Sequence, residues 1–228
     1  IPPPVVNPAD FRSLADYILR GDGKVFQRSG GTETEIYDAA TGPNGDVWPG
    51  NSSNSWQWAD KSGANRRWQF SGSNVHASLE NKAFYFEKSA GTDSNNVSIS
   101  GSPPTGPSGS TWKVTVIAEG YIDASGNPTV QAADSKQNLL FVAGTDIKIG
   151  GTLTSTFIGG GVLAAHEQID ISGNGVVTGF FLGENAAHTQ TLVENTVISG
   201  NPNITYNGLP PPPSIWRLPI VVQAWREK

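Results

Sequence analysis

Apolar and polar residues alternate in a short phrase that returns five times between about Val97 and about Tyr206. Each phrase ends in glycine, and the closing residues are Gly101, Gly126, Gly151, Gly173 and Gly200. The steps between these glycines are 25, 25, 22 and 27 residues. A period of roughly 20 to 50 residues is typical of stacked repeat architectures, so the repeat predicts the fold of most of the chain.

Alignment on the glycines produces two apolar columns with a polar column between them. The first apolar column is Val97, Ile122, Ile147, Ile169 and Thr196, and the second is Ile99, Ala124, Ile149, Ile171 and Ile198. Because alternate residues of a strand face the same side, we expect both columns to face one core. The intervening column should face outward, and it consists of Ser98, Asp123, Lys148, Asp170 and Val197.

A second apolar segment precedes each phrase. These segments are 83–86, 114–117, 139–142 and 162–165, with a weaker fifth at 191–193. Two or three strands in a repeat of about 25 residues describe one coil of a β-helix, and stacked coils bury apolar faces that a single coil cannot. The pattern therefore predicts an all-β protein whose residues 83–208 form a β-solenoid, parallel and β-helix-like, of about five coils. A β-sandwich of short strands is the alternative, which the aligned columns disfavour.

The first 20 residues precede the repeat and carry a helix signal. Asn7 suits the N-cap and Pro8 the first helical position, and apolar residues then recur at helical spacing until Gly21. We expect a short helix, from Pro8 to Arg20, that caps an end of the solenoid, because unpaired strand edges need cover. The alternative is contact with a partner subunit, which the apolar start of the chain favours. The candidate contact residues are Ile1, Val5, Val6, Phe11, Leu14 and Ile18.

Four tryptophans lie in residues 22–82, a segment rich in Gly, Ser, Asn and Asp: Trp48, Trp56, Trp58 and Trp68. Exposed indoles form platforms on which sugar rings stack, so Trp56, Trp58 and Trp68 are candidate ligand-binding residues. The interpretation that we favour is that the tryptophans are buried over the first coil, where an irregular segment needs large apolar groups.

These patterns divide the chain into three regions. Residues 1–82 are expected to form the N-terminal helix and an irregular, Trp-rich capping or docking region, and residues 83–208 the solenoid. Residues 209–228 begin with a run of four prolines, a stiff link, and end in an apolar segment, Ile215–Trp225, expected to be a capping strand.

Composition narrows the function classes. Only 15% of the 228 residues are charged, and 27 glycines and 16 prolines favour a turn-rich, extracellular β protein. A net charge of −5 argues against a nucleic-acid surface, and the absence of cysteine excludes disulfides and cysteine nucleophiles. No apolar run of about 18 residues occurs, so we expect no membrane span within these residues. Because the sequence also lacks methionine, we expect that an N-terminal part was removed, and a signal peptide or anchor would belong to that part.

Candidate catalytic and metal-binding residues are few. The three histidines, His76, His166 and His188, lie far apart, and none has the spacing of metal ligands. His166 with Glu167 and Asp170 is the strongest candidate for a catalytic cluster, but catalysis also needs hydrogen-bond geometry between the groups. We therefore expect no catalytic residue, no metal site and no cofactor.

The outward charges Asp123, Lys148 and Asp170 alternate in sign from one repeat to the next. Polysaccharide lyases with a parallel β-helix carry carboxylates and a basic residue on such a face. A simple ladder, in which each charge neutralises its neighbour on the next strand, is the interpretation that we favour.

Several segments of the repeat region and of the C-terminal part share one pattern: Trp112–Gly120 with Ile122–Pro128, Leu140–Ile149, Ala164–Gly173, and Ile204–Gly208 before Ala224–Arg226. These segments resemble the C-terminal halves of bacterial type IV pilus assembly or minor-pilin-like (PilX-type) proteins. The resemblance covers about residues 80–228 and implies a non-enzymatic structural subunit at the bacterial surface. The chain would form the exposed head of a pilin-like or surface-filament protein, with a role in assembly or adhesion and with other protein subunits as partners. The alternative is a carbohydrate-binding module or a polysaccharide-active β-helix protein.

Overall fold

The structure is a computed structural model of the chain. It describes residues 5–60, 66–89, 95–100, 111–125, 129–150, 161–173, 176–186, 192, 196–199 and 203–205. The expected polyproline link and C-terminal strand therefore lie outside the described residues, as does Ile1.

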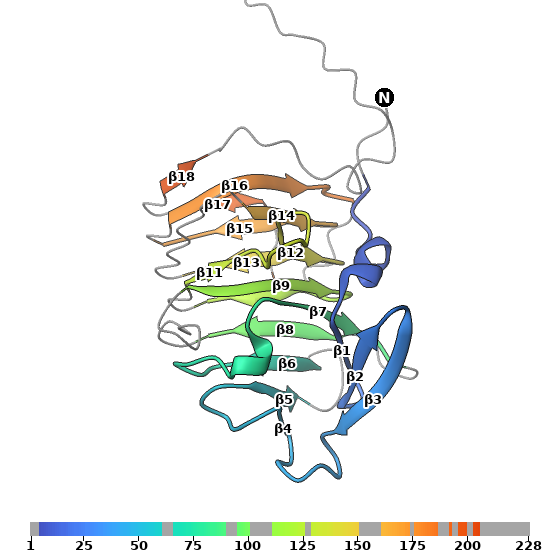
Figure 1. Cartoon of the computed structure of the whole chain (residues 1–228). Helices are drawn as coiled ribbons and strands as arrows, with labels where there is room; N and C mark the ends of the chain where they lie inside the picture. Colours follow the sequence, from blue (N-terminus) through green and yellow to red (C-terminus); the bar gives the residue numbers. More distant parts are fainter. Residues whose placement is uncertain are drawn as a thin grey trace, which may run out of the picture.

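Two mixed β-sheets build the fold (Figure 1). The ten-stranded sheet has the order β18 (Asn203–Thr205), β16 (Val176–Gly183), β14 (Gly161–Ala165), β12 (Leu139–Ala143), β9 (Trp112–Ala118), β7 (Lys82–Glu87), β1 (Tyr17–Arg20), β2 (Lys24–Ser29) and β3 (Thr32–Asp38), with β11 (Val130–Gln131) beside β9. The eight-stranded sheet has the order β17 (Val197–Ile198), β15 (Ile169–Ile171), β13 (Ile147–Ile149), β10 (Ile122–Ala124), β8 (Asn96–Ile99), β6 (Arg67–Phe70), β5 (Trp56–Asp60) and β4 (Val47–Trp48).

The all-β class is confirmed, but the predicted β-solenoid is wrong. The strands form two open sheets that mix parallel and antiparallel pairs, and neither sheet closes on itself. Antiparallel pairs join β1 to β2, β2 to β3, β4 to β5 and β5 to β6. The physical reason lies before the repeat: residues 17–70 lack the repeated phrase and form hairpins that extend both sheets in the antiparallel sense.

The strand register confirms the two apolar columns except at Thr196, which is exposed and belongs to no strand. Val97, Ile122, Ile147 and Ile169 pair on neighbouring parallel strands, as do Ile99, Ala124, Ile149, Ile171 and Ile198. All of them except Ile198 are at most 4% exposed, so the columns face the interior. Ile198 lies on the edge strand β17 and is 62% exposed.

The strands that precede the phrases are confirmed in four cases, at β7, β9, β12 and β14. Of the fifth predicted segment, 191–193, only Leu192 lies in the described part of the chain, in a bend, and the strand that continues the series there is β16, Val176–Gly183. β16 pairs in parallel with β14, so it continues the ten-stranded sheet. The connection from β16 to the next phrase is longer than the one that follows β14, so this strand lies further from its phrase than the pattern predicts.

The predicted helix is present only in part and ends early. Asn7 caps a 3-10 helix, η1 (Pro8–Leu14), by accepting a hydrogen bond from the Ala9 N–H at 3.2 Å. The chain then becomes extended, and residues 17–20 form β1, paired in parallel with β7. Strand pairing prevails over helical spacing here because alternate side chains enter two different cores: Tyr17 and Leu19 enter one and Ile18 the other.

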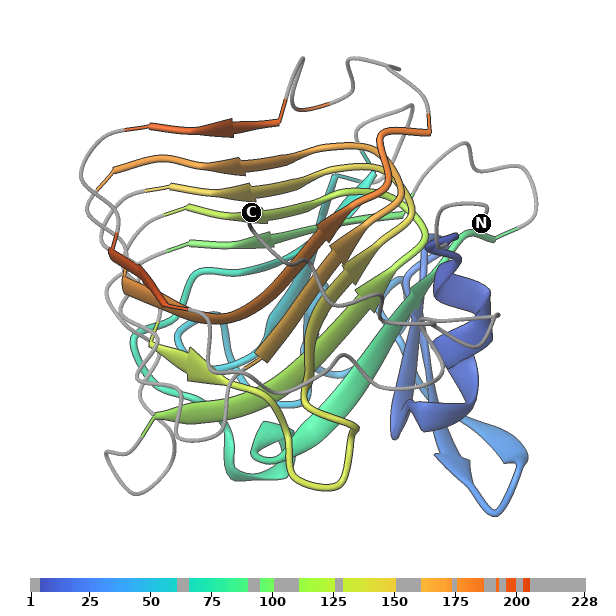
Figure 2. The same ribbon diagram turned by 90° about the horizontal axis from the view of Figure 1, so that it is seen from above.

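The first core lies between the two sheets (Figure 2). At its β4–β6 end it is aromatic, with Trp56 against Phe84 and Phe86 at ring-centroid distances of 5.6 and 5.0 Å. The region 22–82, expected to be irregular, supplies β2 to β6 and the 3-10 turn η3 (Ala77–Leu79) to this end. Strands from both sides of residue 82 therefore belong to the same sheets.

The second core lies on the outer face of the ten-stranded sheet, under a segment that we call the N-terminal strap, residues 5–14. Val6 and Phe11 of the strap are 2% exposed. They pack on outward apolar residues of successive strands: Ile18, Tyr85, Ile117, Val142 and Ala164. The strap therefore covers an apolar sheet face that would otherwise meet water.

Candidate functional site

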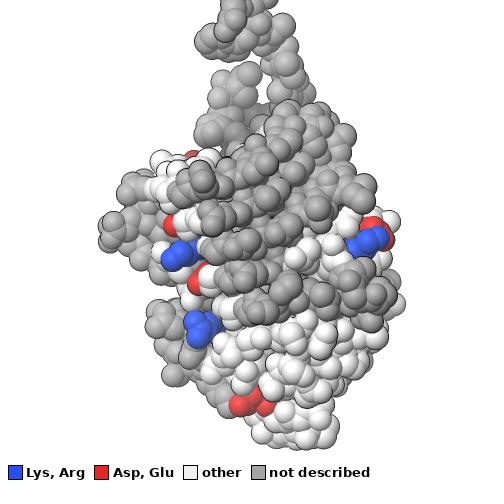
Figure 3. Space-filling model, turned by 90° about the vertical axis from the view of Figure 1, so that its left-hand side faces the viewer, with Lys and Arg blue, Asp and Glu red and all other residues white. Residues whose placement is uncertain are grey.

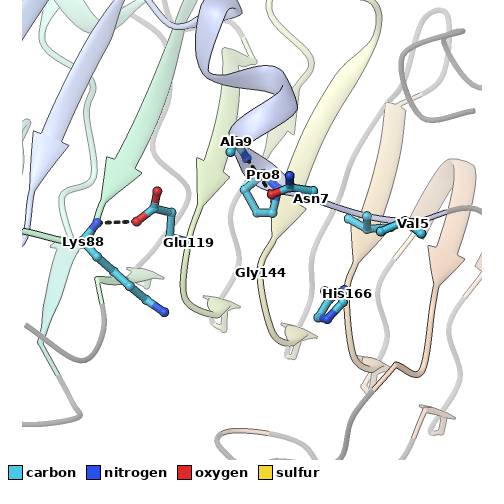
Figure 4. A pocket seen from close by; sticks show the side chains of 9 residues that line it. Val5, Asn7, Pro8, Ala9, Lys88, Glu119, Gly144 and His166 are labelled. Carbon is cyan, nitrogen blue, oxygen red and sulfur yellow. Dashed lines mark hydrogen bonds between the residues drawn. The ribbon is translucent and has the colours of Figure 1, made fainter. Parts of the chain in front are cut away.

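A groove of about 450 Å³ lies between the N-terminal strap and the ends of the ten-stranded sheet's strands (Figure 4). Val5, Val6, Pro8 and Ala9 line one side of it, and the opposite side is formed mainly by residues that follow strand ends. These residues are Lys88 after β7, Glu119 after β9, Gly144 after β12 and His166 after β14. Parallel strands in register bring their ends to one edge of a sheet, so the four residues form a short row.

Gly144 lies in the middle of this row and contributes no side chain to the groove. A Cβ atom at this position would lie 2.4 Å from the carbonyl oxygen of Glu119, so the backbone leaves no room for a side chain. The groove floor between Glu119 and His166 is therefore bare backbone.

One end of the groove is tied by a carboxylate. Glu184 Oε2 lies 2.7 Å from His166 Nδ1 and also accepts the backbone N–H of Val6 at 2.8 Å. The Glu184 side chain is only 9% exposed. A buried carboxylate needs such partners, because an ionised group without them is costly to remove from water. Glu184 thus joins the sheet to the strap.

The other end is tied by Glu119. Its Oε1 accepts the hydroxyl of Tyr85 at 2.7 Å, and its Oε2 accepts the backbone N–H of Lys88 at 2.6 Å. Burial of Tyr85, followed by the hydrogen bond to Glu119, raises the pKa of the phenol well above its usual range. Glu119, which lines the groove, and Glu184, which contacts the groove residues His166 and Val6, therefore both hold structural donors.

The cluster of His166, Glu167 and Asp170 is not formed. His166 pairs with Glu184 instead, and Glu167 is 2% exposed. Asp170 lies in the eight-stranded sheet, with its side chain in the outward column. Among the described groove residues no Ser, Thr or Cys side chain accompanies the histidine.

The candidate ligand-binding tryptophans are buried. Trp56 and Trp68 are fully buried and Trp58 is 9% exposed. The indole N–H of Trp68 donates to the carbonyl of Arg20 at 2.9 Å. The three indoles therefore pack in the core between the sheets and form no surface on which a sugar could stack.

Most of the candidate partner-binding residues are also buried by contacts within the chain. Val6, Phe11 and Ile18 are buried in the second core, and Leu14 is half-buried against it. Val5, by contrast, is 45% exposed at the mouth of the groove. Of the described candidates in the strap, Val5 presents the most surface to a partner.

The outward column carries charges of alternating sign, as expected. Register places Ser98, Asp123, Lys148 and Asp170 side by side on β8, β10, β13 and β15. Figure 3 shows acidic and basic side chains alternating along one side of the molecule. Burial raises the pKa of Asp170, and the positive charge of Lys148 partly opposes that shift.

Glu184 and Glu119 could not be identified from the sequence as the residues that hold these donors. Glu184 follows β16, the strand whose position was mispredicted. With β16 placed, the pairing of Ala165 with Gly183 would have put His166 beside Glu184. Glu119 follows a correctly predicted strand, but its partners come from β7 and its end, 31 and 34 residues away in sequence.

No helix in the described part of the chain is long and apolar enough to cross a membrane. The described residues also contain no group of three or more His, Asp or Glu side chains arranged to hold a metal ion. Comparisons with protein-family models, with curated proteins and with solved structures find no match for this chain. The pilus-family resemblance therefore remains a prediction from the sequence.

Proposed function

We propose that the chain is a non-enzymatic structural subunit of a bacterial surface assembly, the exposed head of a pilin-like or surface-filament protein. In this role it contributes to assembly or adhesion and contacts other protein subunits. The proposal combines the sequence resemblance with the use that the fold makes of its charged groups.

One observation carries the proposal: the polar groups that could do chemistry instead fasten the N-terminal strap to the ten-stranded sheet. Glu184 holds Val6, Arg12 Nε donates to Glu87 at 2.8 Å, and Lys136 Nζ donates to the carbonyl of Leu14 at 2.8 Å. Val6 and Phe11 of the strap are buried against the sheet between these ties. A pull on the start of the strap is thus spread over several bonds and an apolar contact, as suits a subunit that bears load in an assembly.

The alternative of carbohydrate binding through Trp56 and Trp58 lacks a platform, because both indoles are buried. The proposal also predicts that the purified chain turns over no polysaccharide or ester. Turnover that disappears in His166→Ala, with the melting temperature unchanged, would contradict the non-enzymatic part of the proposal.

The test compares two neighbouring strap residues in cells of the source bacterium. Val5 is 45% exposed and Val6 is 2% exposed. We expect Val5→Lys to keep the parental melting temperature but to reduce the amount of the chain in the sheared surface fraction. Val6→Lys should lower both, because it buries an ammonium in the second core.

Two results would sink the proposal. The first is a parental chain found in the cytosolic fraction and not in the sheared one. The second is a Val5→Lys variant that is recovered from the surface in parental amounts and shows that the strap's exposed start contacts no neighbour.

A further inference from the structure

One edge strand of the described sheets is much longer than the others. β4 and β17 have two residues each and β18 has three, whereas β3 has seven. Short edge strands leave few backbone groups open to another chain, so β3 presents the longest open edge among the described strands. Figures 1 and 2 show the β2–β3 hairpin at the rim of the molecule, with none of the described elements beyond β3.

The open edge of β3 presents backbone hydrogen-bond groups to solvent, and residues 32–36 are all exposed. The backbone N–H of Arg28 in β2 donates to the carbonyl of Asp16 at 2.8 Å, so Arg28 bonds toward β1. Consecutive residues of a strand bond toward opposite edges, so the two neighbours of Arg28 bond to β3, where their partners are Thr32 and Thr34. Glu33 lies between these two threonines and therefore directs its N–H and C=O away from β2, toward the open edge.

One face of this edge is acidic. Glu33 and Glu35 are two residues apart on β3, so their side chains point to the same face. Glu33 already contacts Arg12, and Glu35 contacts Lys24 at 2.8 Å, yet the two glutamate side chains remain 30% and 41% exposed. A carboxylate accepts about four hydrogen bonds, so each glutamate has capacity for a further cation from a strand placed alongside.

The same glutamates disfavour a second copy of β3 as the neighbour. Full-length antiparallel pairing of two copies would place Glu35 opposite Glu35. Pairing centred on Thr34 would place Glu33 of each copy opposite Glu35 of the other. Like charges directly opposite one another destabilise a pair of strands, whereas opposite charges stabilise it. The chemistry of the edge therefore selects a basic strand over a second copy.

We propose that β3 receives an added strand from a partner subunit, an extended segment with lysine or arginine at alternate positions. Its backbone bonds to the outward N–H and C=O of Glu33, and its cations lie beside Glu33 and Glu35. The exposed part of β3, residues 32–36, spans about 17 Å, so five to seven residues of the partner fill the edge. The inference deepens the proposed function and rests on it for the presence of a neighbouring subunit.

The first test uses the purified parental chain and a synthetic peptide of the length of β3, seven residues, in which lysine alternates with valine and threonine. The control peptide has glutamate in place of every lysine. Fluorescence anisotropy measures binding, and amide hydrogen exchange followed by NMR locates it. We expect the lysine peptide to bind more tightly than the control and to slow exchange of the Glu33 N–H several-fold. Binding that leaves exchange in β3 unchanged would overturn the proposal.

Two substitutions at one position then separate the backbone from the side chain. Glu33→Pro removes the outward N–H, and proline is tolerated at a sheet edge where this group faces solvent. Glu33→Ala keeps the N–H, and both variants lose the same contact with Arg12. We expect Glu33→Ala to weaken binding of the lysine peptide about two- to five-fold. Glu33→Pro should weaken it about ten-fold further, because a backbone hydrogen bond is also lost.

Thermal unfolding shows whether the two variants keep the β2–β3 pairing, and we expect their melting temperatures to agree within a few degrees. If Glu33→Pro does not fold, the exchange measurement on the parental chain decides. Equal binding of the two peptides, or parental affinity in a folded Glu33→Pro variant, contradicts the proposal. So does protection of the Glu33 N–H that rises with chain concentration in the absence of peptide, because a second copy then fills the edge. The test needs no cells, so its failure is distinguishable from failure of the proposed surface location.

Discussion

Substitution of Ile149 by aspartate tests the buried ladder between the sheets. Ile149 is fully buried and pairs in register with Ala124 on one side and Ile171 on the other. The substitution removes a burial contribution of about 1.5–3 kcal/mol. It also places a carboxyl group among apolar neighbours, which costs at least a further 2 kcal/mol or so when the group finds no hydrogen-bond donor.

The sum, roughly 4 kcal/mol or more, is a large part of the 5–15 kcal/mol that stabilises a typical domain. For a chain of this length it corresponds to a fall in melting temperature of about 8–16 °C. Thermal unfolding followed by circular dichroism measures this shift. Two controls bracket it: Ile149→Val should cost about 0.5–1.5 kcal/mol, and Lys148→Gln, one residue away on the outer face, should change little.

The pH dependence of stability provides a second test of the Ile149→Asp variant. Burial raises the folded-state pKa of the introduced carboxyl above its unfolded value of about 3.9. The neutral form is the one that the fold tolerates, so the difference from the parent should be smallest below about pH 4 and should grow as the pH rises. A variant that melts within a degree or two of the parent at neutral pH would refute the assignment of Ile149 to a dry core.

Three further predictions concern the groove and the N-terminal strap. Gly144→Ala should lower the free energy of unfolding by about 1–3 kcal/mol, because the new Cβ would meet the Glu119 backbone at 2.4 Å. Gly150→Ala, with 3.8 Å contacts, should be nearly neutral, and equal stabilities of the two variants in chemical denaturation would contradict this reasoning. Glu184→Ala should cost about 1–3 kcal/mol and accelerate amide exchange in the strap, and unchanged exchange would show that the tie does not hold it. Tyr85 has a raised pKa in the fold, so its contribution to stability is complete below about pH 10 and is lost above it. Tyr85→Phe should therefore reduce the loss of stability at alkaline pH, and an unaltered slope of stability against pH would argue against the burial of this phenol.

The repeated phrase was sufficient to predict the apolar columns, because a period of two residues within each phrase fixes which side chains face the core. The columns containing Ile122 and Ile149 follow directly from it, and the register agrees. The same phrase could not predict the architecture as a whole. Parallel pairing between repeats is compatible with a closed coil or with open sheets, and the antiparallel hairpins that decide for open sheets lie outside the repeat.

The spacing of apolar residues also predicted the wrong element for a segment whose two faces are buried in two different cores. The sequence from Tyr17 to Arg20 fits a helix by its apolar spacing, yet both faces of this segment are buried as a strand between β7 and β2. The contact between His166 and Glu184 could not be predicted for a similar reason. His166 and Glu184 are 18 residues apart, and only the correct placement of β16 makes them neighbours.

The most direct test of the proposed function is the location of the parental chain on intact cells of its source organism. Immunogold electron microscopy with antibodies against the purified chain provides this measurement, with a deletion strain as the control. The proposed structural role predicts label on the outside of intact cells, along filaments or at their tips, and none on the deletion strain. Label that appears only after the cells are permeabilised would contradict it.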